Sequence, residues 1–140
     1  MAPIAQFDLW IPNDTAEARE VQERIIGLME QNAWPMRECF GVRLALEEAM
    51  VNAIKHGNRM EADKKVFIAC ELTADEITVV IEDQGEGFKP ENVPDPTEDE
   101  NLENPGGRGI MLIRSFMTGV AYNDRGNRLT MSKKLGVENE

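Results

Sequence analysis

The sequence predicts an α+β domain in which one mixed, mostly antiparallel sheet carries three helices on one of its faces. The patterns follow one another as strand, two helices, hairpin, long loop, helix and hairpin, and this order favours the α+β class. A length of 140 residues is typical of one domain. A hydrophobic content of 41% beside 29% charged residues is typical of a folded chain. We therefore expect residues 1–140 to form a single domain.

The N-terminal part of the chain contains a strand and two helices. Apolar and acidic residues alternate over 7–11, just before a proline, which indicates a strand. Apolar residues then recur every three or four positions over 16–32, as in an amphipathic helix. Pro35 marks the start of a second helix, which we expect to end near Gly57. The candidates for the N-cap of the first helix are Asn13, Asp14 and Thr15.

Two β-rich runs in the middle of the chain predict an antiparallel hairpin. They cover residues 66–72 and 77–83, and a short polar connection joins them. From Gln84 to Gly107 there is no periodicity, and Gly, Pro, Asn and acidic residues dominate. A loop of this length inside a domain is usually functional or mobile.

The C-terminal part predicts a third helix and a second hairpin. Residues 110–116 are apolar enough for a short buried helix that follows a run of glycines. Residues 120–122 and 128–135 read as strands, because residues 123–126 between them have the composition of a hairpin turn.

The charge balance excludes some classes of partner. The chain has 26 acidic and 15 basic residues, a formal net charge of -11. Binding to nucleic acid or to an anionic membrane surface needs a basic face, so we expect neither. A signal-peptide pattern, a run of ~20 apolar residues and a cysteine framework are all missing, since Cys39 and Cys70 lie far apart. We therefore expect a cytoplasmic protein.

The second predicted helix carries polar residues that could share a site. Glu48, Asn52 and His56 follow at steps of four residues and lie along one border of the apolar face. Glu47 falls on the other flank, with Arg43. Of the two adjacent glutamates, Glu48 is therefore the one that can act together with Asn52. For an isolated Glu-x-x-x-Asn pattern, a solvated helix flank is the ordinary interpretation.

A second polar segment follows the predicted strand 77–83. Asp83 ends an apolar row of that strand, where a carboxylate is costly to bury unless a donor meets it. The amino group of an adenine is one such donor. Gly85 and Gly87 would let the backbone approach a flat ligand. Taken alone, the segment reads as a glycine-rich turn.

A third segment, Gly106-Gly107-Arg108-Gly109, leads into the last predicted helix. Backbone N–H groups at a helix N-terminus favour an anion, and Arg108 adds a charge-assisted donor for phosphate oxygens. The segment matches neither the Walker A pattern nor the Rossmann glycine pattern.

In their order and spacing, these segments resemble the Bergerat-type ATP-binding fold of the GHKL superfamily. Residues 48–58 are similar to its N box, residues 83–88 to its G1 box and residues 107–109 to its G2 box. Within the superfamily, the chain looks most like the anti-sigma-factor serine kinases of the RsbW/SpoIIAB type. The resemblance covers about residues 5–135.

The resemblance implies ATP and Mg²⁺ as cofactors and gives each motif a role. Asn52 would ligate Mg²⁺ and Glu48 would act as the general base. Asp83 would accept from the adenine amino group, and residues 84–106 would form a lid over ATP. Near the adenine pocket, Arg128 and Thr130 lie close to a position that related chains use, and neither is assigned. The pocket and phosphate contacts would come from Gly85, Gly87, Gly107, Arg108 and Gly109.

The resemblance also implies partners. The acceptor would be a serine of a STAS-type antagonist protein, and a homodimer of the kinase would hold a sigma factor or another regulated output protein. One alternative is an ATP-dependent partner-binding module without kinase activity. Another is the detached catalytic domain of a histidine kinase, although the only histidine, His56, lies within the N box and no phosphoacceptor helix precedes it.

Overall fold

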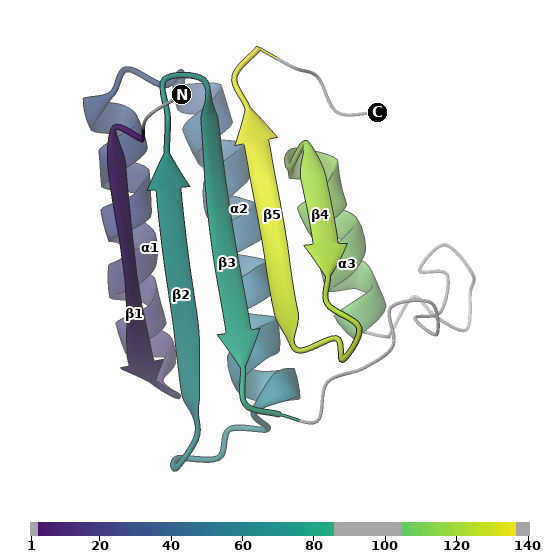
Figure 1. Cartoon of the computed structure of the whole chain (residues 1–140). Helices are drawn as coiled ribbons and strands as arrows, with labels where there is room; N and C mark the ends of the chain where they lie inside the picture. Colours follow the sequence, from purple (N-terminus) through teal and green to yellow (C-terminus); the bar gives the residue numbers. More distant parts are fainter. Residues whose placement is uncertain (1–2, 86–104, 137–140) are drawn as a thin grey trace.

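The structure, a computed structural model, describes residues 3–85 and 105–136, and for residues 105–110 it describes the backbone only. Within these ranges, five strands and three α-helices follow one another in the predicted order (Figure 1). None of these helices has the length and apolar character that a membrane crossing needs. The elements are β1 (Ala5–Pro12), α1 (Thr15–Gln31), α2 (Met36–Val51), the π-helix η1 (Asn52–Gly57), β2 (Lys65–Leu72), β3 (Glu76–Asp83), α3 (Pro105–Phe116), β4 (Gly119–Tyr122) and β5 (Arg128–Lys134).

The strands form one sheet in the order β1-β2-β3-β5-β4. The α+β class, the two hairpins and the position of the three helices on one face are confirmed (Figure 1). The expected mixed pairing is not, because every pairing among the described strands is antiparallel. The reason is the pair of helices between β1 and β2. Helix α1 runs back along the sheet from the end of β1, and α2 returns to that same end. As a result β2 starts at Lys65, beside the end of β1 at Pro12, and runs in the opposite direction.

The core lies between the helices and the inner face of the sheet. Alternate residues of β3 point inward, and Ile77, Val79 and Ile81 are buried. Ile25 and Met29 of α1 are buried against them. Burying a side chain of this size is worth roughly 1.5–3 kcal/mol. The core thus fixes the helices on the sheet, and the predicted site residues Asn52 and Asp83 lie at ends of these elements.

Helix α1 has a defined start and a defined end. The carboxylate of Asp14, one of the three N-cap candidates, accepts a hydrogen bond from the N–H of Ala16 at 2.8 Å. At the other end, Ala33 has a left-handed backbone with φ 61°, and the N–H of Trp34 donates to the carbonyl of Met29 at 3.1 Å. This is a Schellman-type end, in which glycine is the usual residue at the position of Ala33. The side chain of Trp34 is buried in the core.

One helix differs from the prediction in type and another in its start. The second helix ends at Gly57, as predicted, but its last turn is the π-helix η1 and not α-helix. There the N–H of Asn58 donates to the carbonyl of Ala53, five residues back, at 2.8 Å. Helix α3 begins at Pro105, five residues before the expected start, with proline in the first turn, where its missing N–H is not needed.

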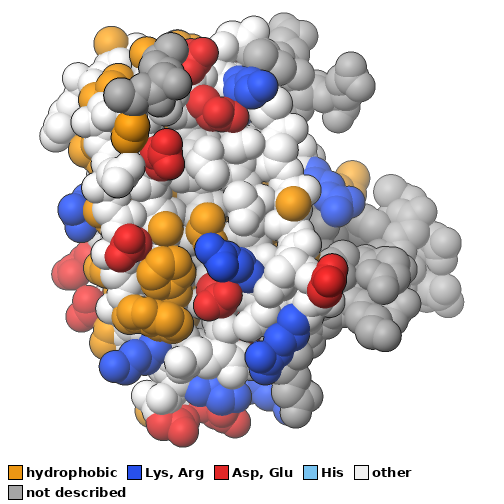
Figure 2. All heavy atoms as spheres, viewed as in Figure 1, with side chains coloured by type: hydrophobic (Ala, Val, Ile, Leu, Met, Phe, Trp, Pro, Cys, Tyr) orange, Lys and Arg blue, Asp and Glu red, His pale blue; other side chains and the backbone are white. Residues whose placement is uncertain are grey.

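The second face of the sheet carries no helix among the described residues. Trp10 of β1 is 50% exposed there, and its ring centroid lies 5.2 Å from that of Phe67 on β2. The strand register places Phe67 opposite Glu82, and Glu82 opposite Arg128. Hydrophobic side chains gather on this face beside acidic and basic ones (Figure 2). We call Trp10, Phe67, Ala69 and Val80 the open-face patch.

Candidate functional site

The three segments that the sequence singles out meet at one end of the sheet. The π-helix η1 packs against β3 and α3. Figure 1 shows that η1, the end of β3 and the start of α3 lie at the same end of the molecule. Asn52 begins η1, Asp83 ends β3, and the Gly107–Gly109 run lies in the first turns of α3. Parts of the chain that are distant in sequence therefore form one candidate site.

Glu48 and Asn52 lie on the side of α2 that faces α3. Gly41 marks this side, since a Cβ added to it would lie 3.1 Å from Cδ1 of Phe116 on α3. Glu48 follows Gly41 by two helical turns and Asn52 follows by three, so the three residues share one stripe. Both polar side chains are half-buried. This is the flank on which the sequence predicts them, whereas His56 at the end of η1 is exposed.

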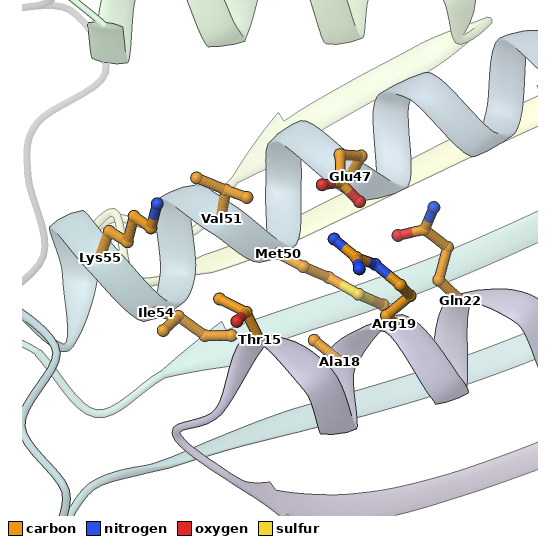
Figure 3. A pocket seen from close by; sticks show the side chains of 9 residues that line it. All are labelled: Thr15, Ala18, Arg19, Gln22, Glu47, Met50, Val51, Ile54 and Lys55. Atoms are coloured by element: carbon orange, nitrogen blue, oxygen red, sulfur yellow. The ribbon is translucent and has the colours of Figure 1, made fainter.

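Glu47 lies on the opposite flank, toward α1. With Val51 it lines a cleft of about 130 Å³ between α1 and α2 (Figure 3). Arg43, on the same flank, forms an ion pair with Glu23 of α1. Pockets for small-molecule ligands usually enclose about 300–1,000 Å³, so this cleft is too small for a nucleotide. Of the adjacent glutamates, only Glu48 belongs to the candidate site.

Asp83 is a half-buried acceptor at the end of β3. Its Oδ1 accepts a hydrogen bond from the N–H of Gly85 at 2.8 Å. Burial raises the pKa of this carboxyl, while the Gly85 hydrogen bond and the positive charge of Arg125 lower it. Within the described residues, Oδ2 accepts no hydrogen bond. A half-buried carboxylate oxygen without a donor is suited to accept one from a ligand.

Two glycines allow the segments of the site to approach one another. A Cβ on Gly57 would lie 2.2 Å from Oδ2 of Asp83. A Cβ on Gly85 would lie 1.9 Å from the carbonyl oxygen of Gly57. Any side chain at either position would displace the other segment, so the end of η1 and the loop after β3 form one packed unit.

Asn58 joins these segments from the side of η1, and it is fully buried. Its Oδ1 accepts from the N–H of Gln84 at 2.7 Å, and its Nδ2 donates to the carbonyl of Lys65 at 3.0 Å. The same Nδ2 also donates to Oδ1 of Asn13 at 3.1 Å. No role was predicted for Asn58 from the sequence, because two of its three partners, Asn13 and Gln84, lie far away in the chain.

The β4–β5 turn, residues 123–127, also contacts the site, at the end of β3. Asp83 and Asn127 share two hydrogen bonds: the N–H of Asp83 donates to the carbonyl of Asn127 at 2.9 Å, and Nδ2 of Asn127 donates to the carbonyl of Asp83 at 3.0 Å. Arg125 donates from Nη2 to the carbonyl of Gly85 at 2.9 Å. The sequence predicts this turn but gives it no part in the site. Arg128 and Thr130, which the sequence left unassigned, alternate with buried residues and lie on the open face of the sheet.

The predicted phosphate segment is part of a helix. Because α3 begins at Pro105, Gly107, Arg108 and Gly109 lie within its first turns and not before it. The first four N–H positions of an α-helix have no partner within the helix, and proline has no N–H. The free N–H groups that the described part of α3 offers therefore belong to Gly106 and Gly107. Gly87 and most of the predicted lid, residues 86–104, lie outside the described residues.

The side chains at this end of the sheet fit a purine nucleotide with magnesium. Oδ2 of Asp83 can accept from an exocyclic amino group, and the start of α3 offers N–H groups to phosphates. In the described part of the chain, no three His, Cys, Asp or Glu residues gather into a metal site. Mg²⁺ commonly takes one or two protein oxygens together with waters and substrate phosphates, so a single ligand such as Asn52 fits it.

Comparison with known proteins identifies a family and several relatives of this chain. A family model described as "Histidine kinase-like ATPase domain" matches residues 11–133. The anti-sigma F factor of Clostridium perfringens (strain 13 / Type A) is 30% identical over 109 residues, 73% of this chain and 76% of that protein. The anti-sigma F factor of Oceanobacillus iheyensis is 34% identical over 106 residues, 71% of this chain and 72% of that protein. The serine-protein kinase RsbW of Staphylococcus epidermidis is 33% identical over 104 residues, 69% of this chain and 65% of that protein.

Proposed function

The chain belongs to the histidine kinase-like ATPase domain family, and we propose that it is a cytoplasmic protein-serine kinase, dependent on ATP and Mg²⁺, that also acts as an anti-sigma factor. The observation that carries the proposal is the packed unit of Gly57, Asp83 and Gly85, which leaves one half-buried carboxylate oxygen ready for an adenine amino group. Glu48 and Asn52 lie on the neighbouring flank of α2 and η1.

Glu48 and Asn52 would carry the chemistry. Bound ATP would supply the phosphoryl group, and Mg²⁺ would offset the charge on the phosphate oxygens. The side-chain oxygen of Asn52 would ligate Mg²⁺. Glu48 would accept the proton of the acceptor serine as its oxygen bonds to the γ-phosphorus and the bond to the leaving ADP breaks. The half-buried position of both side chains supports these roles.

The other residues would hold the nucleotide. Asp83 would accept from the adenine amino group, with Gly85 and Gly87 shaping the pocket. The glycines of α3 would present backbone N–H groups to the phosphates, and Arg108 would add a positive charge. The phosphate contacts would come from Gly107, Arg108 and Gly109.

The relatives support the choice of partners. Two are named anti-sigma F factor, and one is named serine-protein kinase RsbW. We therefore propose that this chain binds a sigma factor or another output protein and phosphorylates a serine of a STAS-type antagonist. Sequestration of a partner in an ATP-dependent manner, without phosphoryl transfer, is the alternative.

The open-face patch supports a homodimer. A half-exposed tryptophan packed on Phe67 is costly to leave in water, and aromatic residues are enriched at protein interfaces. Glu82 and Arg128, adjacent on this face, could each meet the opposite charge of a second copy. Trp10→Glu should therefore shift the protein toward the monomer in sedimentation measurements. Phe40→Glu is the control, because Phe40 is 59% exposed on α2, away from this face.

Phosphotransfer tests the proposal directly. The protein is incubated with γ-labelled ATP and Mg²⁺, together with each STAS-domain protein recovered from the source cells by pull-down in the presence of ATP or ADP. We expect label on a serine of one such antagonist. Nucleotide-dependent partner binding without any transfer of label would favour the sequestering module, and a protein that binds no ATP would refute both.

A further inference from the structure

The β4–β5 turn contacts the adenine end of the proposed nucleotide site. From its contacts we infer that Arg125 is a positioning residue that sets the preference for adenine, by holding the Asp83–Gly85 segment so that Asp83 presents a free oxygen to the base. The inference rests on the proposed function, because it assumes that Asp83 meets the purine.

The contact of Arg125 is specific and distant in sequence. Nη2 donates to the carbonyl of Gly85 at 2.9 Å, and the N–H of Gly85 donates to Oδ1 of Asp83 at 2.8 Å. Gly85 is therefore held at both of its polar groups. Because Oδ1 already accepts from Gly85, the orientation of Gly85 favours Oδ2 as the oxygen that accepts from a ligand.

The turn that carries Arg125 is itself well fixed. Oδ1 of Asn123 accepts hydrogen bonds from the N–H groups of Gly126, Asn127 and Arg128 at 2.8, 3.1 and 3.1 Å. Gly126 has φ 80°, a left-handed backbone that glycine adopts without strain. Arg125 is therefore presented from an ordered turn, and less conformational entropy is lost when its guanidinium binds Gly85.

Charge adds to this geometry. Asp83 must be ionised to offer only acceptors, because a protonated carboxyl also carries a donor. Arg125 and Lys64 favour the ionised form, as does the N–H of Gly85, whereas Glu82 and burial oppose it. Tyr122 also lies within the electrostatic reach of Asp83. An ionised carboxylate accepts from the 6-amino group of adenine but repels the 6-oxo group of hypoxanthine. Loss of Arg125 should therefore weaken the discrimination between the two bases.

The test compares ATP with inosine triphosphate, which has an oxygen in place of the 6-amino group. Dissociation constants for both nucleotides are measured with Mg²⁺ for the wild type, Arg125→Gln, Arg125→Lys and Arg128→Gln. Arg128 is the matched control, a neighbouring arginine on the open face of the sheet. For Arg125→Gln we expect a loss of ATP affinity of about 3- to 10-fold, the range of one hydrogen bond, with unchanged affinity for inosine triphosphate. Arg125→Lys should keep part of the preference for ATP over inosine triphosphate, and Arg128→Gln should keep all of it.

The pH dependence gives a second readout. The pH below which ATP affinity falls should be higher in Arg125→Gln than in the wild type, because the positive charge that favours ionised Asp83 is gone. An equal loss of affinity for both nucleotides, or an unchanged preference for ATP, would overturn the role of Arg125. A wild-type protein that binds neither nucleotide would instead overturn the proposed function.

Discussion

Gly57 and Asp83 are in such close contact that a Cβ on Gly57 would lie 2.2 Å from the carboxylate oxygen Oδ2. This contact joins the end of η1 to the end of β3 at the centre of the candidate site. Binding of a base at Asp83 should therefore depend on the backbone of η1 as much as on the carboxylate itself.

Alanine at Gly57 or Gly85 should impair nucleotide binding. We expect at least a 10-fold loss of ATP affinity for either variant, since the added methyl group must displace Asp83 or the carbonyl of Gly57. Overpacking of this kind also costs typically 1–3 kcal/mol of stability, so thermal unfolding is measured beside calorimetric ATP binding. Gly27→Ala is the control, because a Cβ on Gly27 would meet no atom within 4 Å and the residue lies inside α1. This variant should keep its ATP affinity and gain about 0.5–1 kcal/mol in the free energy of unfolding. Normal ATP affinity in Gly57→Ala would place the nucleotide elsewhere.

Glu48→Ala should abolish phosphoryl transfer and leave ATP binding largely intact. Loss of a general base typically costs about 10²- to 10⁴-fold in rate. Glu47→Ala is the matched control, because the neighbouring glutamate lies on the α1 side of α2. Transfer rates to a cognate antagonist and ATP affinities are measured for both variants. Equal transfer rates in the two variants would remove Glu48 from the mechanism.

Asp83→Asn should stabilise the fold at neutral pH while it weakens ATP binding. Burial raises the pKa of Asp83 above its ordinary value of 3.8, so the folded chain holds this proton more tightly than the unfolded chain does. The free energy of unfolding of the wild type therefore falls as the pH rises from 3.8 through the raised pKa, and it stays lower above it. The variant does not lose this free energy of unfolding. The difference in stability between variant and wild type should therefore shrink as the pH falls through that interval.

Chemical denaturation of both proteins across the acidic range and at neutral pH measures this difference. Subtraction of the wild type from the variant cancels the contribution of the other acidic residues. A variant less stable than the wild type at neutral pH would mean that the Gly85 hydrogen bond and Arg125 outweigh the burial of the charge.

Ala33→Gly should stabilise the protein. A left-handed backbone costs a non-glycine residue roughly 1–2 kcal/mol, and the greater freedom of glycine in the unfolded chain removes part of that gain. We expect a net increase of about 0.5–1 kcal/mol in the free energy of unfolding. Ala74→Gly in the β2–β3 turn is the control, since φ of Ala74 is not positive, and it should lose stability. A loss of stability in Ala33→Gly comparable to that of the control would argue against the left-handed backbone of Ala33 at the end of α1.

The strands and α1 were predictable because each leaves a local signal along the chain, either a periodic pattern or a β-rich run beside turn residues. The β-rich run placed β3 within one residue of its observed start, and alternation along it identified the row that ends at Asp83 as the buried one. The stripe through Glu48 and Asn52 was also predictable, since both lie where α2 continues with regular geometry or η1 only begins.

The rest could not be predicted, because it depends on contacts between distant residues. A period of 3.6 residues cannot indicate η1, whose widened turn is packed against Asp83 through Gly57. Asn58, Arg125 and Asn127 act on the segment 83–85 across separations of 26, 40 and 44 residues. No local pattern marks such partners. The early start of α3 was not predicted, because the glycines before residue 110 disfavour a helix, although the proline at 105 suits a first helical turn.

The two tryptophans of the chain lie in opposite surroundings, since Trp34 is 5% exposed in the core and Trp10 is 50% exposed on the sheet. Their intrinsic fluorescence therefore reports two different events. A soluble quencher should reach Trp10 in the monomer. It should not quench the fluorescence of Trp34 until the chain unfolds. The wild-type protein thus carries an optical probe of self-association and a second probe of unfolding, and a single titration can separate the two without any label.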